Sequence, residues 1–79
     1  MSEQTVYLTR EGYEKLEAEL NHLRTVRRQE VARRLHDALA EGDLLENAEL
    51  EAARNEQAFV EGRILELEAL LANVEIIEE

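Results

Sequence analysis

The first half of the chain carries a stripe of apolar or long-stemmed side chains at steps of three and four residues. Residues spaced in this way fall on one face of an α-helix, so the stripe predicts a helix over residues about 9–40. Two steps of four around Val31 depart from a strict heptad, and any supercoil should relax there. The stripe consists of Tyr13, Leu16, Leu20, Leu23, Arg27, Val31, Leu35 and Ala38.

The second half repeats the pattern with a cleaner heptad spacing, which predicts a second helix over residues about 44–73. Gly42 is the only strong helix breaker in the middle, so residues 41–43 are the predicted tip turn. Asn73 is a residue type that can end a helix in a left-handed conformation. The apolar positions are Ala53, Val60, Ile64, Leu67, Leu71 and Val74, with Phe59 and Leu70 beside them.

Short β-prone segments flank the two helices, at residues 6–8 and 74–77. Thr9 suits the N-cap position of the first helix. Because the predicted link is too short for anything but antiparallel neighbours, the two flanking segments should meet and pair. The predicted fold is therefore all-α: one domain over residues 1–79, an antiparallel two-helix coiled-coil hairpin with an acidic tip. At 1.5 Å per residue its arms are roughly 45 Å long.

The composition excludes several classes of site. The 79 residues include neither cysteine nor proline, and 35% are charged. Disulfides and thiolate metal sites are therefore impossible, and helix packing must supply nearly all the stability. No apolar run approaches the about 18 residues of a membrane span, and nothing resembles a signal peptide. We therefore expect a cytoplasmic protein without a membrane partner.

The net charge of −10 is unevenly distributed. Residues 24–34 contain five arginines and one acid, a local charge of +4, whereas residues 37–51 contain six acids and no base, a local charge of −6. Attraction to phosphates requires a positive surface. We therefore expect no indiscriminate or stand-alone sequence-specific binding of nucleic acid, although a local basic face could still contact it.

Asp43 and Glu46 admit two interpretations. They have the D-x-x-E spacing of a capping box, and both would complement the dipole of the second helix. Alternatively, they bind Mg²⁺, which prefers one or two carboxylates together with waters and a substrate phosphate. Two carboxylates at an exposed tip would hold the metal only weakly unless a partner supplied the other ligands. An enzyme acting alone is disfavoured, because so thin a hairpin cannot exclude water.

The basic stretch also has two interpretations. Arg24, Arg27, Arg28 and Arg34 could pair with acids of the second helix while their stems cover the seam. They could instead contact a phosphodiester backbone, for which the bidentate guanidinium is suited. Arg54, on the second helix, could join such a strip.

Three further positions are assigned structural or solvated roles. His22 and His36 lie on opposite sides of the basic stretch, fourteen residues apart, and are expected to be solvated, not metal ligands. Position 62 is expected to require a residue as small as glycine because another helix approaches it closely.

Four stretches occur in an order and spacing that match a known family over nearly the whole chain: LTREGYEKLEAEL (8–20), VRRQEV (26–31), GDLLENAELEAAR (42–54) and NEQAFVEGRI (55–64). The G-D-L-x-E-N-A-E segment is specific, unlike a generic heptad. In these stretches the chain resembles the N-terminal domain of bacterial Gre transcript-cleavage factors, the GreA-like branch.

The resemblance implies a coiled coil that enters the secondary channel of RNA polymerase and stimulates cleavage of the 3′ end of backtracked RNA. Matched by position, Asp43 and Glu46 correspond to the two functional tip acids, which hold a second Mg²⁺ only within the polymerase complex. The polymerase holds the first metal and is the enzyme. Arg54 matches a basic residue near the RNA end, with Asn47 and Glu49 as further orienting groups.

The chain departs from the family pattern in two respects. Leu39 and Leu45 stand at commonly basic positions and Leu50 at a commonly aromatic one, which weakens the RNA-contacting surface. Family members also carry a C-terminal domain that docks on the polymerase, and the chain ends after Glu79, about where that domain would begin. We therefore expect this domain alone to bind polymerase weakly and to require a higher concentration.

Two other functions remain open at this point. The same hairpin could enter the same channel and inhibit, because the leucines at the tip could block without supporting cleavage. A protein of another class, a plain structural coiled-coil interaction module, would have the same outline. Replacing the two tip acids would separate these functions.

Overall fold

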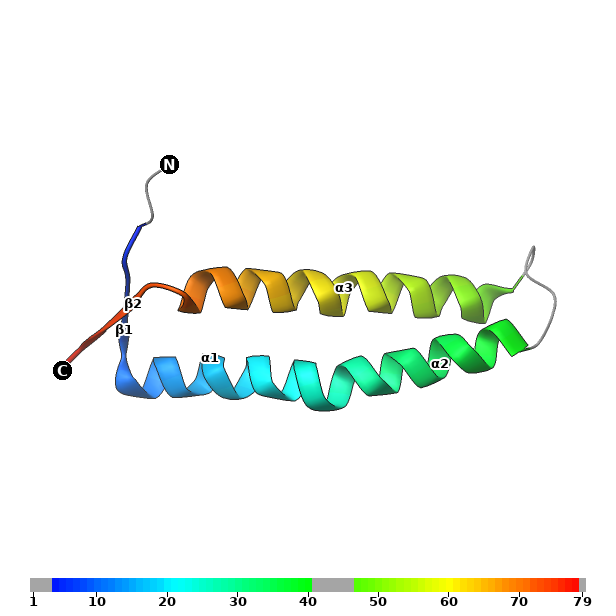
Figure 1. Cartoon of the computed structure of the whole chain (residues 1–79), viewed down its shortest axis with the longest axis horizontal. Helices are drawn as coiled ribbons and strands as arrows, with labels where there is room; N and C mark the ends of the chain where they lie inside the picture. Colours follow the sequence, from blue (N-terminus) through cyan, green and yellow to red (C-terminus); the bar gives the residue numbers. More distant parts are fainter. Residues whose placement is uncertain (1–3, 41–46, 79) are drawn as a thin grey trace.

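The chain folds into a rod of two helical arms with a small sheet at one end, as Figure 1 shows in the computed structural model. The structure describes residues 4–40 and 47–78. The first arm consists of α1 (Arg10–His22), a π-helical segment η1 (Leu23–Arg27) and α2 (Arg28–Ala40), and the second arm is α3 (Ala48–Leu71). The molecule measures 54 × 27 × 14 Å. The predicted antiparallel hairpin is confirmed.

The first arm begins where the sequence predicts. Thr9 has an extended backbone, and its side-chain oxygen accepts a hydrogen bond from the Gly12 amide at 3.1 Å. This bond satisfies one of the amides that have no partner in the first turn of a helix. The predicted N-cap is therefore confirmed, and α1 starts at Arg10.

The π-helical segment accounts for the irregular heptad of the first arm. The Arg28 amide donates to the carbonyl of Leu23, five residues earlier. One such turn accommodates a single extra residue in a helix. As a result both Leu23 and Val31 stay buried against α3. The sequence predicts a departure from the heptad spacing around Val31. The structure accommodates it about one turn earlier, in the π-helical turn of η1.

The second helix begins later than the sequence predicts. It starts at Ala48 and not near residue 44, because Asn47 has an extended backbone and its side-chain oxygen accepts from the Leu50 amide at 3.0 Å. The predicted capping box of Asp43 and Glu46 is therefore wrong as the start of this helix. Those two residues and the predicted tip turn at 41–43 lie outside the described residues.

The second helix also ends earlier, at Leu71, with Ala72 in a right-handed helical conformation as its C-cap. Asn73 instead belongs to the turn into the sheet, and its carbonyl accepts the Val6 amide at 2.9 Å. The backbone beyond α3 is thus hydrogen-bonded to β1.

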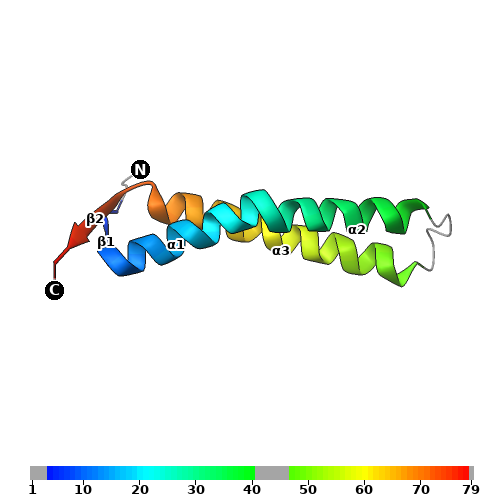
Figure 2. The same cartoon turned by 90° about the horizontal axis from the view of Figure 1, so that it is seen from below.

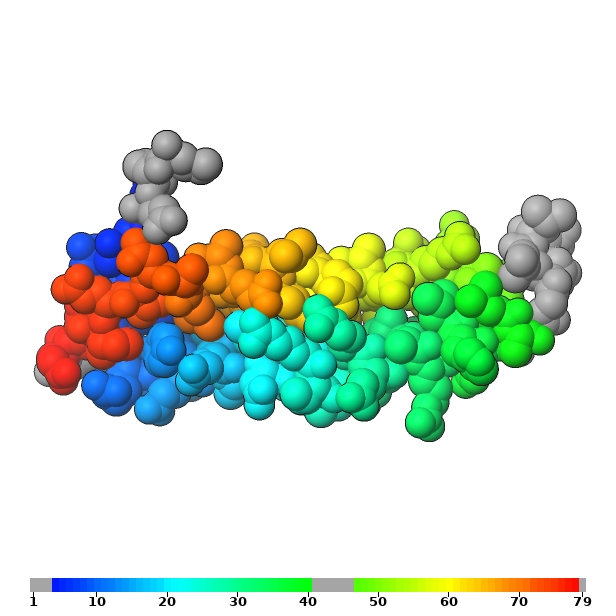
Figure 3. Space-filling view, viewed as in Figure 1, coloured from blue at the N-terminus to red at the C-terminus, as the bar shows by residue number. Residues whose placement is uncertain are grey.

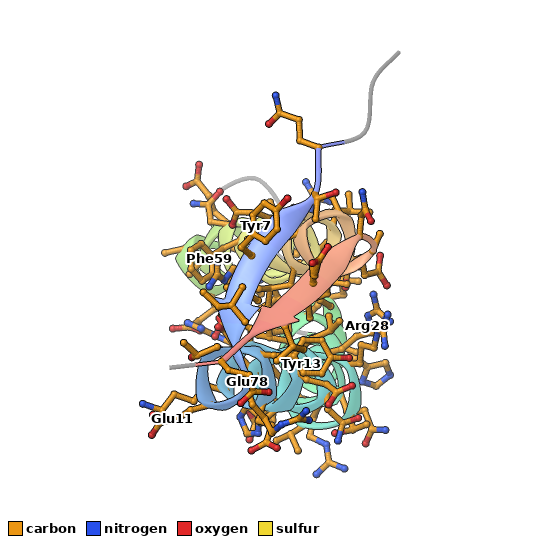
Figure 4. The ribbon with its side chains drawn as sticks, turned by 90° about the vertical axis from the view of Figure 1, so that its left-hand side faces the viewer. Tyr7, Glu11, Tyr13, Arg28, Phe59 and Glu78 are labelled. Carbon is orange, nitrogen blue, oxygen red and sulfur yellow. The ribbon has the colours of Figure 1, made fainter. Side chains whose placement is uncertain are left out.

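Strands β1 (Val6–Thr9) and β2 (Val74–Ile77) pair in parallel, with Val6 opposite Val74. Both strands cross the base of the rod from the α3 side to the α1 side, as Figure 1 and the end-on view in Figure 4 show, and Figure 2 shows the two strands from below at the same end of the rod. Parallel neighbours require a long crossover, and the whole hairpin provides it. The predicted pairing at the base is confirmed.

The core is a single seam between the arms. Space-filling atoms of the two arms meet along the rod in Figure 3. A cluster of large side chains fills the seam toward the base, and smaller residues line it toward the tip. The buried residues are Leu20, Leu23, Val31, Ala38, Leu50, Ala53, Val60, Ile64 and Leu67.

Gly62 is not close to another helix. A Cβ added at this glycine would find no atom of residues 4–40 and 47–78 within 4 Å outside its own helix backbone. The predicted close approach is therefore wrong, since α3 turns Gly62 away from the first arm. None of the helices in the described part of the chain is long and apolar enough to cross a membrane.

Candidate functional site

The candidate site is the end of the rod opposite the sheet, where residues 41–46 join the two arms (Figure 1). Asp43 and Glu46 belong to this segment and lie outside the described residues, so their role in metal binding stays a prediction. The described residues on either side are Ala40, at the end of α2, and Asn47, before α3.

Asn47 connects the two arms at the tip. Its side-chain NH₂ donates to the carbonyl of Ala38 at 2.7 Å, while its side-chain oxygen accepts from the Leu50 amide. Its own carbonyl accepts from the Glu51 amide at 3.2 Å. The Ala38 carbonyl belongs to the last turn of α2, whose carbonyls have no helical partner. One side chain thus caps α3 and ties it to α2.

Glu56 is the centre of an ion-pair network below the tip. Its carboxylate accepts from Arg34 at 2.7 Å and also pairs with Arg27, and Arg34 reaches Glu49 at 3.2 Å. The Arg27 guanidinium, followed by that of Arg34, lowers the pKa of the Glu56 carboxyl from its ordinary value. These charge-assisted hydrogen bonds hold η1 and α2 against α3.

Two further arginines of the basic stretch also pair across the seam. Arg28 makes a bidentate contact with Glu61, both bonds at 2.8 Å, and Arg24 bonds Glu68 at 2.5 Å. The interpretation that this stretch pairs with acids of the second helix is therefore confirmed. Its contact with RNA or polymerase stays a prediction.

Arg54 differs from the paired arginines. It lies in the second turn of α3, is exposed, and forms no ion pair with any carboxylate of residues 4–40 and 47–78. Arg27, Arg28 and Arg34 are each held by at least one carboxylate. Of the predicted contact residues that the structure describes, Arg54 is therefore the one cation without a carboxylate partner among those residues.

The leucines near the tip do not share one environment. Leu39 is 45% exposed, whereas Leu50 is only 4% exposed and belongs to the seam. Leu45 lies outside the described residues. The expectation that Leu50 contributes to a blocking surface is therefore wrong, because packing against the other arm removes it from solvent.

The described residues hold no preformed metal cluster. Within residues 4–40 and 47–78, no group of three or more His, Asp or Glu side chains could hold a metal ion. His22 and His36 are both exposed, as expected of solvated residues.

Two functional features escaped prediction from the sequence. Asn47 directly precedes the helix and is a favoured N-cap residue, but the nearby capping-box pattern competed with it. Its bond to Ala38 gave no sequence signal. Glu56 lies 29 and 22 residues from Arg27 and Arg34, and only the register of the arms brings the three together.

A family model described as "Transcription elongation factor, N-terminal" (GreA_GreB_N) matches residues 6–76 of the chain. Transcription elongation factor GreA of Syntrophomonas wolfei is 54% identical over 77 residues, which cover 98% of this chain and 48% of that protein. GreA of Thermoanaerobacter pseudethanolicus is 57% identical over 74 residues, 94% of this chain and 47% of that protein.

Two solved structures of a GreA homologue are also similar to this chain in fold and sequence. GreA factor homolog 1 (Gfh1) of Thermus thermophilus has a TM-score of 0.80 at 38% identity and covers 96% of this chain and 49% of its own. A second structure of the transcription factor Gfh1 has a TM-score of 0.86 at 37% identity over 99% of this chain and 49% of its own. The chain thus spans about half the length of these relatives. It belongs to the family of N-terminal domains of the transcription elongation factors GreA and GreB.

Proposed function

We propose that this chain acts on bacterial RNA polymerase, by entering the secondary channel and stimulating cleavage of backtracked RNA. The observation that carries the proposal is membership of the GreA/GreB N-terminal family over residues 6–76. In this proposal the polymerase performs the chemistry on the 3′ end of the RNA, and the chain delivers side chains to it.

The shape of the molecule supports this function. The rod is 54 Å long and only 14 Å thick in its thinnest direction, dimensions suited to a narrow channel. The sheet and the large core residues lie toward the base, and the candidate site lies at the opposite end (Figure 1). The side chain of Asn47 bonds the carbonyl of Ala38 and so holds the two arms together next to the tip segment. The tip residues would therefore be attached to two arms of fixed spacing.

Asp43 and Glu46 are the residues that we propose to hold a second Mg²⁺ within the polymerase complex. Carboxylate oxygens are the donors that Mg²⁺ prefers, and polymerase and RNA phosphate would complete the shell. When bound, such a metal would act as a Lewis acid that stabilises the negative charge developing on the phosphate during hydrolysis, and it would help to generate the attacking hydroxide. The chain's own contribution is to position the two carboxylates at the end of a rigid rod.

We assign contact with the RNA phosphate to Arg54 ahead of Arg27, Arg28 and Arg34. Those three guanidinium groups already bond carboxylates of the hairpin, and each would have to exchange a partner before binding RNA. Asn47 and Glu49 would orient the tip, through the bond to Ala38 and the pair with Arg34 respectively.

The test is RNA release from a stalled, backtracked elongation complex with Mg²⁺, at high concentrations of the chain. The parent should accelerate cleavage, and Asp43→Asn and Glu46→Gln should each abolish the acceleration. Glu51→Gln is the matched control, because Glu51 is an exposed acid in the first turn of α3 without an assigned role. All variants should remain helical by circular dichroism. Equal cleavage by the parent and both tip variants would contradict the proposal.

Inhibition through the same channel is the second candidate, and the exposed Leu39 favours it, because a basic residue there would suit RNA better. In the same assay an inhibitor would slow elongation without accelerating cleavage. If Leu39 causes the block, Leu39→Lys should relieve it. A structural module would change neither reaction.

A further inference from the structure

The outer face of α3 is apolar, although it points away from the first arm. Phe59 is 70% exposed and Leu65 is 67% exposed, and both are among the most exposed large apolar side chains of the described residues. At helical spacing they share one face with Gly62. The other exposed residues of this face are Ala58, Glu66 and Ala69. A helix with apolar residues on two faces is expected to be covered on both, yet the first arm covers only one.

Gly62 is the second observation that marks this face. A glycine in the middle of a helix is destabilising, and it is usually explained by a close contact within the fold. Here a Cβ would meet nothing within 4 Å. The missing side chain leaves a shallow notch between Phe59 and Leu65 where an external surface could come close to the helix backbone.

The two sides of the rod are occupied differently. On one side Arg24 and Arg28 bond Glu68 and Glu61 across the seam, and on the other Arg63 bonds Glu19 at 2.8 Å. In the end-on view of Figure 4, Arg28 and Phe59 lie on opposite sides of the molecule. Ion pairs between the arms thus lie along both sides of the seam. Among the described residues, the outer face of α3 makes no such pair with the first arm and is apolar.

The charge and size of the face determine which occupant fits. Glu66 is its only charged member and shares Arg63, at 2.8 Å, with Glu19, so the face carries no more than one unbalanced negative charge in a chain of net charge −10. From Ala58 to Ala69 it is about 17 Å long and about 10 Å wide, on the order of 200 Å². A stable complex buries about 800 Å² per partner. Because two copies would also repel each other, the face suits an additional contact within a larger assembly, not a dimer.

We infer that Phe59, Gly62 and Leu65 form a docking surface for an apolar, uncharged wall of the RNA polymerase channel. The inference rests on the proposed function and adds a second contact to it, along the side of the rod and apart from the tip. The notch at Gly62 lets the wall approach the α3 backbone, and the two large side chains flank it.

The experiment measures binding of the parent chain, labelled at its N-terminal amine, to bacterial RNA polymerase core enzyme by fluorescence anisotropy. Gly62→Gln fills the notch and should weaken binding about tenfold while raising the thermal midpoint, because glutamine forms helix better than glycine. The double variant Phe59→Ser, Leu65→Ser should weaken binding to a similar extent. Ala32→Gln adds a similar side chain at an exposed position of α2 and should bind as the parent does.

A loss of affinity together with a gain of stability separates docking from folding, since damage to the fold would lower both. Binding of Gly62→Gln at parental strength, or equal weakening by Ala32→Gln, would overturn the inference while leaving the proposed function intact. A parental dimer in analytical ultracentrifugation that Gly62→Gln abolishes would identify a second copy as the occupant and also overturn it. Absence of any binding by the parent would remove the proposed function together with the inference.

Discussion

The base half and the tip half of the rod are held together by different interactions. Toward the base, Leu20, Leu23, Ile64 and Leu67 form one buried cluster, and the paired strands cover its end. Ion pairs cross the seam in both halves, but toward the tip the buried residues are fewer, Leu50 with the small Ala38 and Ala53, and polar contacts make up a larger share. Those contacts are the network of Glu56 with Arg27 and Arg34, the pair of Arg34 with Glu49, and the Asn47 bond to Ala38.

The base half therefore contributes most of the stability, and the candidate functional site lies beyond the tip half. Apolar burial provides most of the free energy of folding, so the base half is expected to determine whether the hairpin exists. Two of the three buried residues of the tip half, Ala38 and Ala53, are small and let the arms approach closely, and directional bonds then fix the alignment of the arms. In the proposed function, a slender tip half would suit insertion into the polymerase channel.

The largest expected effect is at the base. Leu67 is fully buried, and Leu67→Ala should lower the free energy of unfolding by about 2–5 kcal/mol, because it removes apolar contacts and leaves a cavity. Thermal unfolding followed by circular dichroism measures the change. Leu65→Ala on the same helix is the control, and its 67% exposure predicts a change within about 0.5 kcal/mol. Similar losses in both variants would contradict a core confined to the seam.

A cap removed at the tip should act locally. Asn47→Ala should cost about 1 kcal/mol and expose the first turn of α3, because both the cap and the bond to Ala38 are lost. Hydrogen exchange should accelerate at the Leu50 amide and stay unchanged at the Leu67 amide. Thr9→Ala removes the equivalent cap at the base and should leave Leu50 protected. Uniform loss of protection in both variants would show that the halves unfold together.

The open position of Gly62 predicts a gain. Gly62→Ala should raise the free energy of unfolding by up to about 1 kcal/mol, since alanine forms helix better and its Cβ meets no atom. Chemical denaturation measures the gain. Ala58→Gly on the same outer face should cause a loss of similar size. A loss from Gly62→Ala would mean that this part of α3 is covered within the chain.

The smallest expected effect belongs to the polar network. Glu56→Gln should lower stability slightly at neutral pH and low salt, because solvent-accessible ion pairs contribute little. The pKa of Glu56 lies below its ordinary value of 4.5, so the ionised carboxylate contributes stability above that pH. The difference between parent and variant should therefore disappear as pH falls through the lowered pKa, and also at about 1 M salt. A difference that persists in acid would assign the effect to packing.

The sequence predicted the elements well where a periodic pattern was long, and less well at their ends. The stripes predicted both arms, and Thr9 was correctly placed as a cap. The start of α3 is predicted about four residues too early, because Asp43 and Glu46 match a capping box whereas the side chain of Asn47 is the actual cap. The close approach predicted at Gly62 is wrong because this glycine lies on the face of α3 opposite the apolar stripe of Val60, Ile64 and Leu67.

The amino-acid sequence alone determined the hairpin, its acidic tip and its family, since these depend on local periodicity, turn residues and a specific motif. The tertiary structure decided which charges neutralise each other and which side chains remain available. Arg34 and Glu56 lie 22 residues apart and meet only through the register of the two arms. The same register buries Leu50 and leaves Phe59 and Gly62 open. Register is a collective result of packing along the whole seam, and no single stretch of sequence encodes it.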